Sequence, residues 1–283
     1  MTADSSDNDA STRGRTTEMR VRRVDHAGVE LVVAEVGEGG PALLFLHPNA
    51  ADHTFFRPQV EEFSDRHRVV AIDQRGYGES GKPEGPYTPA AFAEDVAFVI
   101  DELGLDRPVV LGCSMGGAVA LELAARHPHA VRGLVVLNRS IVNNPAMGST
   151  IAALAARLRG DQGEAALQAL VGAQIGEMDA PELHAEYTRM AKSVPPWVLA
   201  ATMEGFVDWD GEAALRRVTV PTLFTFSHMT GNYAELDRLV ELSPHVVIGH
   251  TVGAGHFDHL TVPEQVNPML RRFLDIYVEE RRA

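Results

Sequence analysis

Ser114 lies in a sequence pattern that can turn a serine hydroxyl into a nucleophile. The stretch Pro108–Gly117 reads PVVLGCSMGG, so that Gly112 and Gly116 stand two residues on either side of the serine. An apolar strand before it and an Ala- and Leu-rich helix after it are expected to hold the hydroxyl on a tight turn at the end of a sheet. Backbone N–H groups at the start of that helix can bind an anion. The stretch therefore predicts a nucleophile for acyl transfer.

A serine nucleophile needs a base, and His256 is the best candidate among the twelve histidines. It lies in the glycine-flanked segment GAGHFDHL, after a late strand and far downstream of Ser114. Two N–H groups are expected to stabilise the oxyanion. One belongs to Met115. The other belongs to Asn49, by its backbone and also its side-chain amide, because the preceding Pro48 has no N–H to donate.

Four segments together resemble the α/β-hydrolase family, in its capped branch of epoxide hydrolases, esterases and lactonases. They are the strand ending in His47, the loop DQRGYGES at 73–80, the elbow GCSMGG at 112–117, and GAGHFDHLTVPEQV at 253–266. The resemblance extends from Met19 to the C-terminus. It implies a nucleophile at Ser114, a base at His256 and a helical cap between the sixth and seventh strands.

The third member of the expected triad, an acid that orients the histidine, is absent from its two usual places. Residues 227–230 after the seventh strand read Ser-His-Met-Thr, and the end of the sixth strand carries Asn138. Asn138 can orient His256 through its side-chain oxygen, a carboxylate from elsewhere can do so, or the chemistry is not ordinary ester hydrolysis. The carboxylates nearest to suitable loops in the sequence are Asp208, Asp210 and Asp258.

Apolar strands that alternate with amphipathic helices predict an α/β fold with a doubly wound, mostly parallel sheet of about eight strands. The strand pattern stops over 139–217, where an Ala-, Leu- and Met-rich stretch predicts an inserted all-helical cap. We therefore expect a core over 19–138 and 218–283. Residues 1–18 lack apolar periodicity and a hydrophobic signal region, which predicts a disordered tail.

Composition excludes several classes of partner. The formal charge of −14 argues against nucleic acid and anionic membranes, and no apolar run is long enough to span a bilayer. The single cysteine, Cys113, fits a reducing compartment, so we expect a cytoplasmic protein. No motif predicts a metal or a cofactor; the expected partner is a small-molecule substrate, and a homodimer is compatible with the sequence.

Phe55, Trp197 and Phe206 are the predicted substrate-binding residues, because the cap offers apolar and aromatic surface near the site. These features favour a serine hydrolase that cleaves a medium-sized, largely apolar or aromatic ester or lactone through a Ser-His mechanism with an acyl-enzyme. Two other classes remain open. One is a non-hydrolytic enzyme that uses the histidine base for cofactor-free oxygenation, carbon–carbon cleavage or cyclisation, and the other is a ligand-binding protein.

Overall fold

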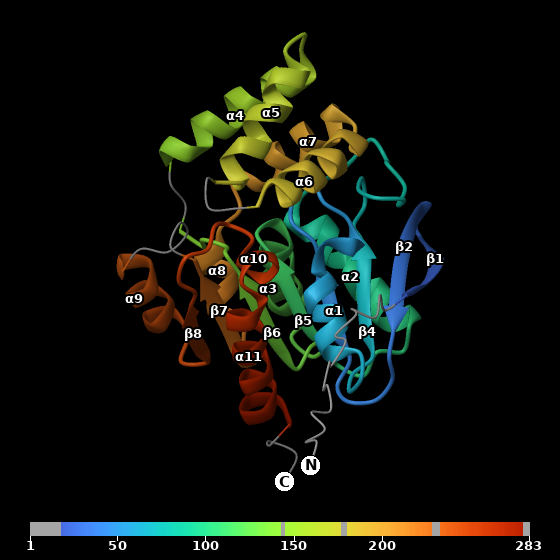
Figure 1. The fold of residues 1–283 in the computed structure, drawn as a ribbon, viewed down its shortest axis with the longest axis vertical. Helices are drawn as coiled ribbons and strands as arrows, with labels where there is room; N and C mark the ends of the chain where they lie inside the picture. The colour runs from blue at the N-terminus through green and yellow to red at the C-terminus, as the bar shows by residue number, and fades with distance from the viewer. Residues whose placement is uncertain (1–17, 143–144, 177–179, 228–232, 280–283) are drawn as a thin grey trace, which may run out of the picture.

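The computed structural model describes residues 18–142, 145–176, 180–227 and 233–279; the predicted disordered tail therefore lies almost wholly outside the described residues. Figure 1 shows one sheet with helices on both faces and a further layer of helices beyond one end of the sheet. This arrangement confirms the predicted α/β class and the predicted sheet of about eight strands. Among the described residues, no helix is both long and apolar enough to cross a membrane.

The eight strands follow the order β1-β2-β4-β3-β5-β6-β7-β8 across the sheet. β1 and β2 form an antiparallel hairpin, β2 pairs antiparallel with β4, and all later pairs are parallel. The bounds are β1 (Arg20–His26), β2 (Val29–Val36), β3 (Leu43–Leu46), β4 (Val69–Asp73), β5 (Val109–Cys113), β6 (Gly133–Leu137), β7 (Thr222–Phe226) and β8 (Val246–His250).

The central strands are buried along their whole length. Every residue of β3, β4, β5, β6 and β7 is buried, which explains why their sequences are continuous apolar runs instead of alternating patterns. Parallel strands all end at the same edge of the sheet. The loops after β3, β4, β5, β6 and β8, which carry the candidate residues, therefore meet at one edge.

Helices cover both faces of the sheet. α2 and α3 pack together with α8 on one face, and α1, α10 and α11 lie on the other (Figure 1). The bounds are η1 (His53–Phe56, a 3₁₀ turn), α1 (Arg57–Phe63), α2 (Pro89–Glu102), α3 (Met115–Arg126), α8 (Gly211–Arg216), α9 (Tyr233–Leu242), α10 (Asp258–Thr261), α11 (Pro263–Phe273) and the π-helical η2 (Leu274–Glu279).

The start of α2 shows how local sequence sets these boundaries. Thr88 caps the helix, since its hydroxyl oxygen accepts a hydrogen bond from the N–H of Ala91 at 3.2 Å, and Pro89 takes the first helical position. The predicted apolar face is buried, with Phe92 and Val99 fully covered. Capping and periodicity together therefore predict this helix.

Four helices form a separate layer beyond the carboxyl edge of the sheet (Figure 1). They are α4 (Pro145–Arg159), α5 (Gly163–Gln174), α6 (Pro181–Ser193) and α7 (Pro196–Phe206), and we call them the helical layer. α4 packs against α5 and α7, and α5 packs against α6. α8, which follows them in the chain, packs instead against α3 of the core.

Candidate active site

Ser114 occupies a strained turn between β5 and α3. Its φ angle is 51°, in the left-handed region that a non-glycine residue rarely adopts, and its N–H donates to the Leu137 carbonyl at 2.9 Å. A Cβ on Gly112 would overlap the carbonyl of Gly116, and a Cβ on Gly116 would overlap the carbonyl of Leu46. Both glycines are therefore required by close backbone approach, as in a nucleophile elbow.

The helix that starts at Met115 directs N–H groups toward Ser114. The first N–H groups of a helix have no intrahelical acceptor, so the Met115 N–H is available to an anion. The facing loop is fixed by His47. The N–H of Gln74 donates to Nε2 of His47 at 3.0 Å, so the ring proton is on Nδ1, which donates to the Pro48 carbonyl at 2.8 Å. Burial lowers the pKa of His47, which keeps it neutral.

Asn49 accepts hydrogen bonds from two tyrosines. The Tyr77 hydroxyl lies 2.7 Å from its side-chain oxygen and 2.8 Å from the hydroxyl of Thr202 in α7. The hydroxyl of Tyr187 in α6 donates to the Asn49 carbonyl at 2.8 Å. The helical layer is thus hydrogen-bonded directly to the loop predicted to stabilise an oxyanion. The Asn49 side-chain oxygen bonds Tyr77.

His256 lies in the loop between β8 and α10, next to the ring of Phe257 at a centroid distance of 5.0 Å. Its Nε2 atom is buried and has no hydrogen-bond partner. Burial, with a smaller contribution from the positive charge of Arg139, lowers the pKa of His256 to about 4. The imidazole is therefore neutral at physiological pH, as a general base must be before it accepts a proton.

Asn138 contacts Asp258 at the carboxyl edge of β6. Its side-chain amide donates to Oδ1 of Asp258 at 2.7 Å, and its side-chain oxygen accepts the N–H of Ser227 at 2.7 Å. Neither of these bonds goes to His256. Asp258 is fully buried, also accepts the Thr251 hydroxyl at 3.0 Å, and has its pKa raised by burial to about 6. A buried carboxylate, two residues after His256, is thus attached to the residue in the acid position.

The two other acidic candidates lie elsewhere. Asp210 caps α8 by accepting the Ala213 N–H at 2.9 Å, and Asp208 is exposed. The segment after β7, residues 227–230, contains no acidic residue. Its residues 228–230 lie outside the described residues. Asp258 is therefore the carboxylate that the fold brings to the candidate site.

The predicted substrate-binding residues take part in aromatic packing. Phe55 is buried, with its ring centroid 4.8 Å from that of Phe257. Trp197 packs against Tyr87 and Phe206 packs against Phe92, at centroid distances of 5.9 and 5.8 Å. Trp197 and Phe206 keep partial exposure, whereas Phe55 is core. A role in substrate binding stays a prediction for all three.

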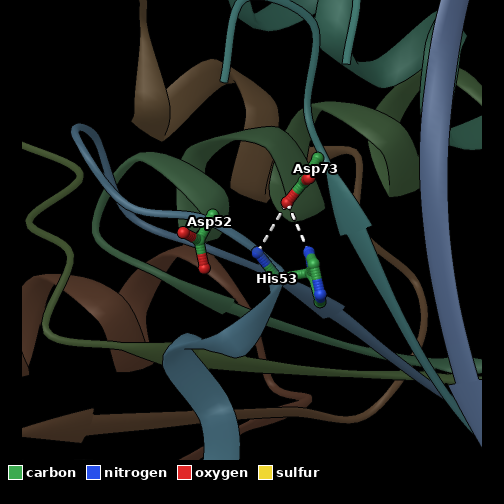
Figure 2. A group of neighbouring side chains, drawn as sticks. All are labelled: Asp52, His53 and Asp73. Atoms are coloured by element: carbon green, nitrogen blue, oxygen red, sulfur yellow. Dashed lines mark hydrogen bonds and ion pairs between the residues drawn. The ribbon is translucent and has the colours of Figure 1, made fainter. Parts of the chain in front are cut away.

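Asp52, His53 and Asp73 form a cluster beside this edge (Figure 2), and among the described residues they are the group whose ligand atoms all lie within 4.8 Å of one another. The sequence pattern predicted no metal here. Asp73 Oδ1 accepts the backbone N–H of His53 at 2.7 Å and lies 2.8 Å from its ring Nδ1, while Oδ2 accepts the Glu79 N–H at 2.8 Å. Asp52 caps the following turn through Thr54. The carboxylate oxygens of Asp52 and Asp73 therefore already accept hydrogen bonds that hold these loops together.

The His53–Asp73 pair predicts a pH-dependent contribution to stability. Burial alone would lower the pKa of His53, but the hydrogen bond and charge of Asp73 raise it above its ordinary value. Stabilisation from protonated His53 is full below the unfolded pKa and is lost as pH rises through the folded pKa. We expect His53→Ala to cost roughly 1 kcal/mol more at pH 6 than at pH 8.5 in urea unfolding. Equal costs at both pH values would contradict this, and exposed His129→Ala is the control.

Three contacts of this region are absent from the sequence-based expectations. His259 is fully buried between Phe55, Phe56 and Phe257. No pattern in the sequence indicates a role for Tyr187 or Arg139. Each residue contacts partners far away in the sequence, which periodicity does not reveal.

Comparison with known proteins identifies relatives along most of the chain. Residues 41–263 match the family model described as alpha/beta hydrolase fold. A 2-(acetamidomethylene)succinate hydrolase of Mesorhizobium japonicum is 28% identical over 265 residues, covering 90% of this chain and 95% of the relative. A thermophilic esterase from Thermogutta terrifontis has a TM-score of 0.81 at 26% identity, covering 90% of this chain and 98% of its own. Est816, described as an N-acyl homoserine lactone degrading enzyme, has a TM-score of 0.76 at 26% identity, covering 89% and 100%.

Proposed function

The chain belongs to the α/β-hydrolase fold family and is a hydrolase, and from this premise we propose that it cleaves an ester or lactone through an acyl-enzyme on Ser114. The observation that carries the proposal is the strained conformation of Ser114, with φ of 51° at the start of α3. Such strain persists where the surrounding structure enforces it, and it commonly marks a functional site.

The proposed reaction divides the work among four groups. Ser114 Oγ attacks the substrate carbonyl while Nε2 of His256 accepts its proton. The N–H groups of Met115 and Asn49 stabilise the oxyanion. His256 then donates the proton to the leaving oxygen, which departs and leaves an acyl-serine. Water, deprotonated by the same histidine, hydrolyses the acyl-enzyme and regenerates Ser114.

We propose that Asn138 acts as a positioning residue by holding Asp258. A triad acid stabilises the imidazolium that forms during catalysis, and Asn138 itself has no charge to offer. The Asp258 carboxylate, to which Asn138 donates at 2.7 Å, can supply that charge from the same loop as the base. Asn138 and Asp258 then share the role that a single acid has in the family.

Two matched substitutions test this assignment at neutral pH. In Asn138→Asp two carboxyl groups in contact share one proton, so the pair keeps one negative charge, and we expect kcat/KM to stay within about threefold of the wild type or to rise. Asp258→Asn removes that charge, and we expect a loss of about 10²-fold. Steady-state kinetics, with thermal unfolding as a check of folding, give the answer. Unchanged kcat/KM in Asp258→Asn would exclude the role.

The substrate is proposed from the surroundings and the relatives. Trp197 and Phe206 give partly exposed aromatic surface in the helical layer, which suits a medium-sized acyl or aryl group. The structural relatives include an esterase and a lactone-degrading enzyme. The test is a panel of p-nitrophenyl esters of increasing acyl length, aryl acetates, and γ- and δ-lactones. Saturable hydrolysis of at least one ester or lactone is expected, and no hydrolysis across the panel would overturn the proposal.

A further inference from the structure

Arg139 is a partly buried cation beside the candidate active site, and the proposed mechanism does not use it. It follows Asn138 directly at the end of β6. Its Cβ would lie 3.1 Å from a Cβ built on Gly117, so the side chain begins next to the first turn of the nucleophile helix. Its Nε atom is buried and has no hydrogen-bond partner. The guanidinium carbon lies 5.0 Å from the ring centroid of Trp209.

Trp209, whose ring covers one side of the Arg139 guanidinium, is held in place by a hydrogen bond. The indole N–H of Trp209 donates to a carboxylate oxygen of Glu122 in α3 at 3.1 Å, which holds the indole ring in its orientation. Cation–π contact with this ring stabilises the charge of Arg139 but satisfies none of its N–H donors. One face of the cation is therefore covered by an aromatic ring while hydrogen-bonding capacity is left over.

Compensating negative charge is weak around Arg139. Within the described part of the chain, no carboxylate oxygen lies within 4.0 Å of a guanidinium nitrogen of Arg139, the limit for an ion pair. The carboxylate that raises the pKa of Arg139 is that of Glu235 in α9, which accepts the Ile141 N–H at 3.0 Å. Burial lowers the pKa of Arg139 to about 10, so it stays protonated at neutral pH. A partly buried cation with an unsatisfied donor is stabilised when an anion joins it.

The charge of Arg139 reaches the base. It is the charged neighbour that, after burial, lowers the pKa of His256. An anion bound to the guanidinium would therefore offset part of the effect that Arg139 has on His256. Guanidinium N–H groups match a carboxylate in a bidentate fork, which favours a carboxylate over a neutral acceptor.

We propose that Arg139 binds a carboxylate of the substrate, so that the preferred substrates carry an anionic carboxylate in addition to the ester or lactone group that is cleaved. This inference rests on the proposed serine-hydrolase function and names its substrate class. It refines the expectation of a largely apolar or aromatic substrate to one with an apolar body and one negative end. When the carboxylate neutralises Arg139, the base is relieved of a repulsive charge and becomes a stronger proton acceptor.

A matched pair of esters tests the proposal. Mono-p-nitrophenyl glutarate carries a free carboxylate, and its methyl ester is the neutral equivalent. We expect the wild type to prefer the anionic ester, and Arg139→Gln to lower the ratio of the two kcat/KM values by about 10–100-fold. Arg139→Lys is expected to retain part of the preference. Arg272→Gln, which removes the same charge from an exposed site on α11, should leave the ratio unchanged.

A binding measurement separates this proposal from the hydrolytic function. Glutarate itself, which has no bond to cleave, is expected to raise the Tm of the wild type by about 2 °C or more at millimolar concentration, and to lose this effect in Arg139→Gln. Glutarate stabilisation without cleavage of either ester would support the anion site and overturn the hydrolase proposal. Hydrolysis with an equal loss for both esters in Arg139→Gln, and no glutarate effect in the wild type, would overturn the anion site alone.

Discussion

Ser114→Ala is expected to lower kcat by at least about 10³-fold on any ester or lactone that the wild type hydrolyses. The reason is that alanine keeps the backbone turn and the oxyanion N–H groups but removes the only atom that can form the acyl-enzyme. Residual activity then comes from binding and oxyanion stabilisation alone. Initial rates at saturating substrate, measured with enzyme purified separately from the wild type, give the number.

The control for this substitution is Ser193→Ala, which makes the same chemical change at an exposed position of α6. It should keep full activity. The thermal unfolding of Ser114→Ala should stay near that of the wild type, because no side-chain hydrogen bond to a described residue is lost. If Ser114→Ala kept more than about a tenth of the wild-type kcat, the covalent mechanism would be wrong.

His256→Ala is expected to lower kcat by a similar factor, about 10³-fold or more, because the serine then has no base to take its proton. The effects of Ser114→Ala and His256→Ala should not add, since the two residues act as one unit. A double variant as slow as either single variant is the predicted outcome. A further 10³-fold loss in the double variant would mean that the residues act in separate steps.

The pH dependence of kcat/KM in the wild type tests the role of His256 as the base. A base must be deprotonated, and burial together with Arg139 lowers the pKa of His256 to about 4. Because the free enzyme sets the profile of kcat/KM, and the proposed mechanism needs both a neutral His256 and an ionised Asp258, the profile for a neutral ester should fall in two steps, near pH 6 and near pH 4. The step near pH 6 should vanish in Asp258→Asn. A single step near pH 6.5 that persists in Asp258→Asn would contradict this prediction.

The fold could be predicted from local sequence because each central strand or helix has a recognisable pattern within a few consecutive residues. The continuous apolar runs at β3, β4 and β5 could only be strands covered on both faces, and the Thr88-Pro89 pair marks the start of α2. The glycines around Ser114 indicated a nucleophile elbow, since no side chain fits where their backbones approach neighbouring carbonyls. These features depend on neighbours within a few residues.

The contacts that complete the candidate site could not be predicted in this way. Asn138 meets Asp258 across 120 residues, and Tyr187 reaches the Asn49 carbonyl across 138. Arg139 lies against Trp209 because β6 and the segment before α8 both pack around α3. Nothing in the sequence near any of these residues indicates its partner. The sequence places Asn138 at the end of β6, while its bond to Asp258 follows only from the fold.

The proposed anion site and the catalytic base are coupled through the charge of Arg139. An acid position held by an asparagine and a base of low pKa would make a slow serine hydrolase toward neutral esters. A carboxylate that neutralises Arg139 removes part of the cause of that low pKa. The preference for an anionic substrate would thus raise the rate of proton transfer as well as the affinity, so it should appear in kcat as well as in KM.

The central claim is that Ser114 is a nucleophile activated by His256, and the most direct measurement is the intact mass of the protein after treatment with a fluorophosphonate probe. Such a probe reacts with an activated serine and remains attached through a covalent bond. We predict one adduct per chain in the wild type, none in Ser114→Ala, and none within the same reaction time in His256→Ala. A folded wild-type protein that takes up no probe, or an adduct that persists in Ser114→Ala, would contradict it.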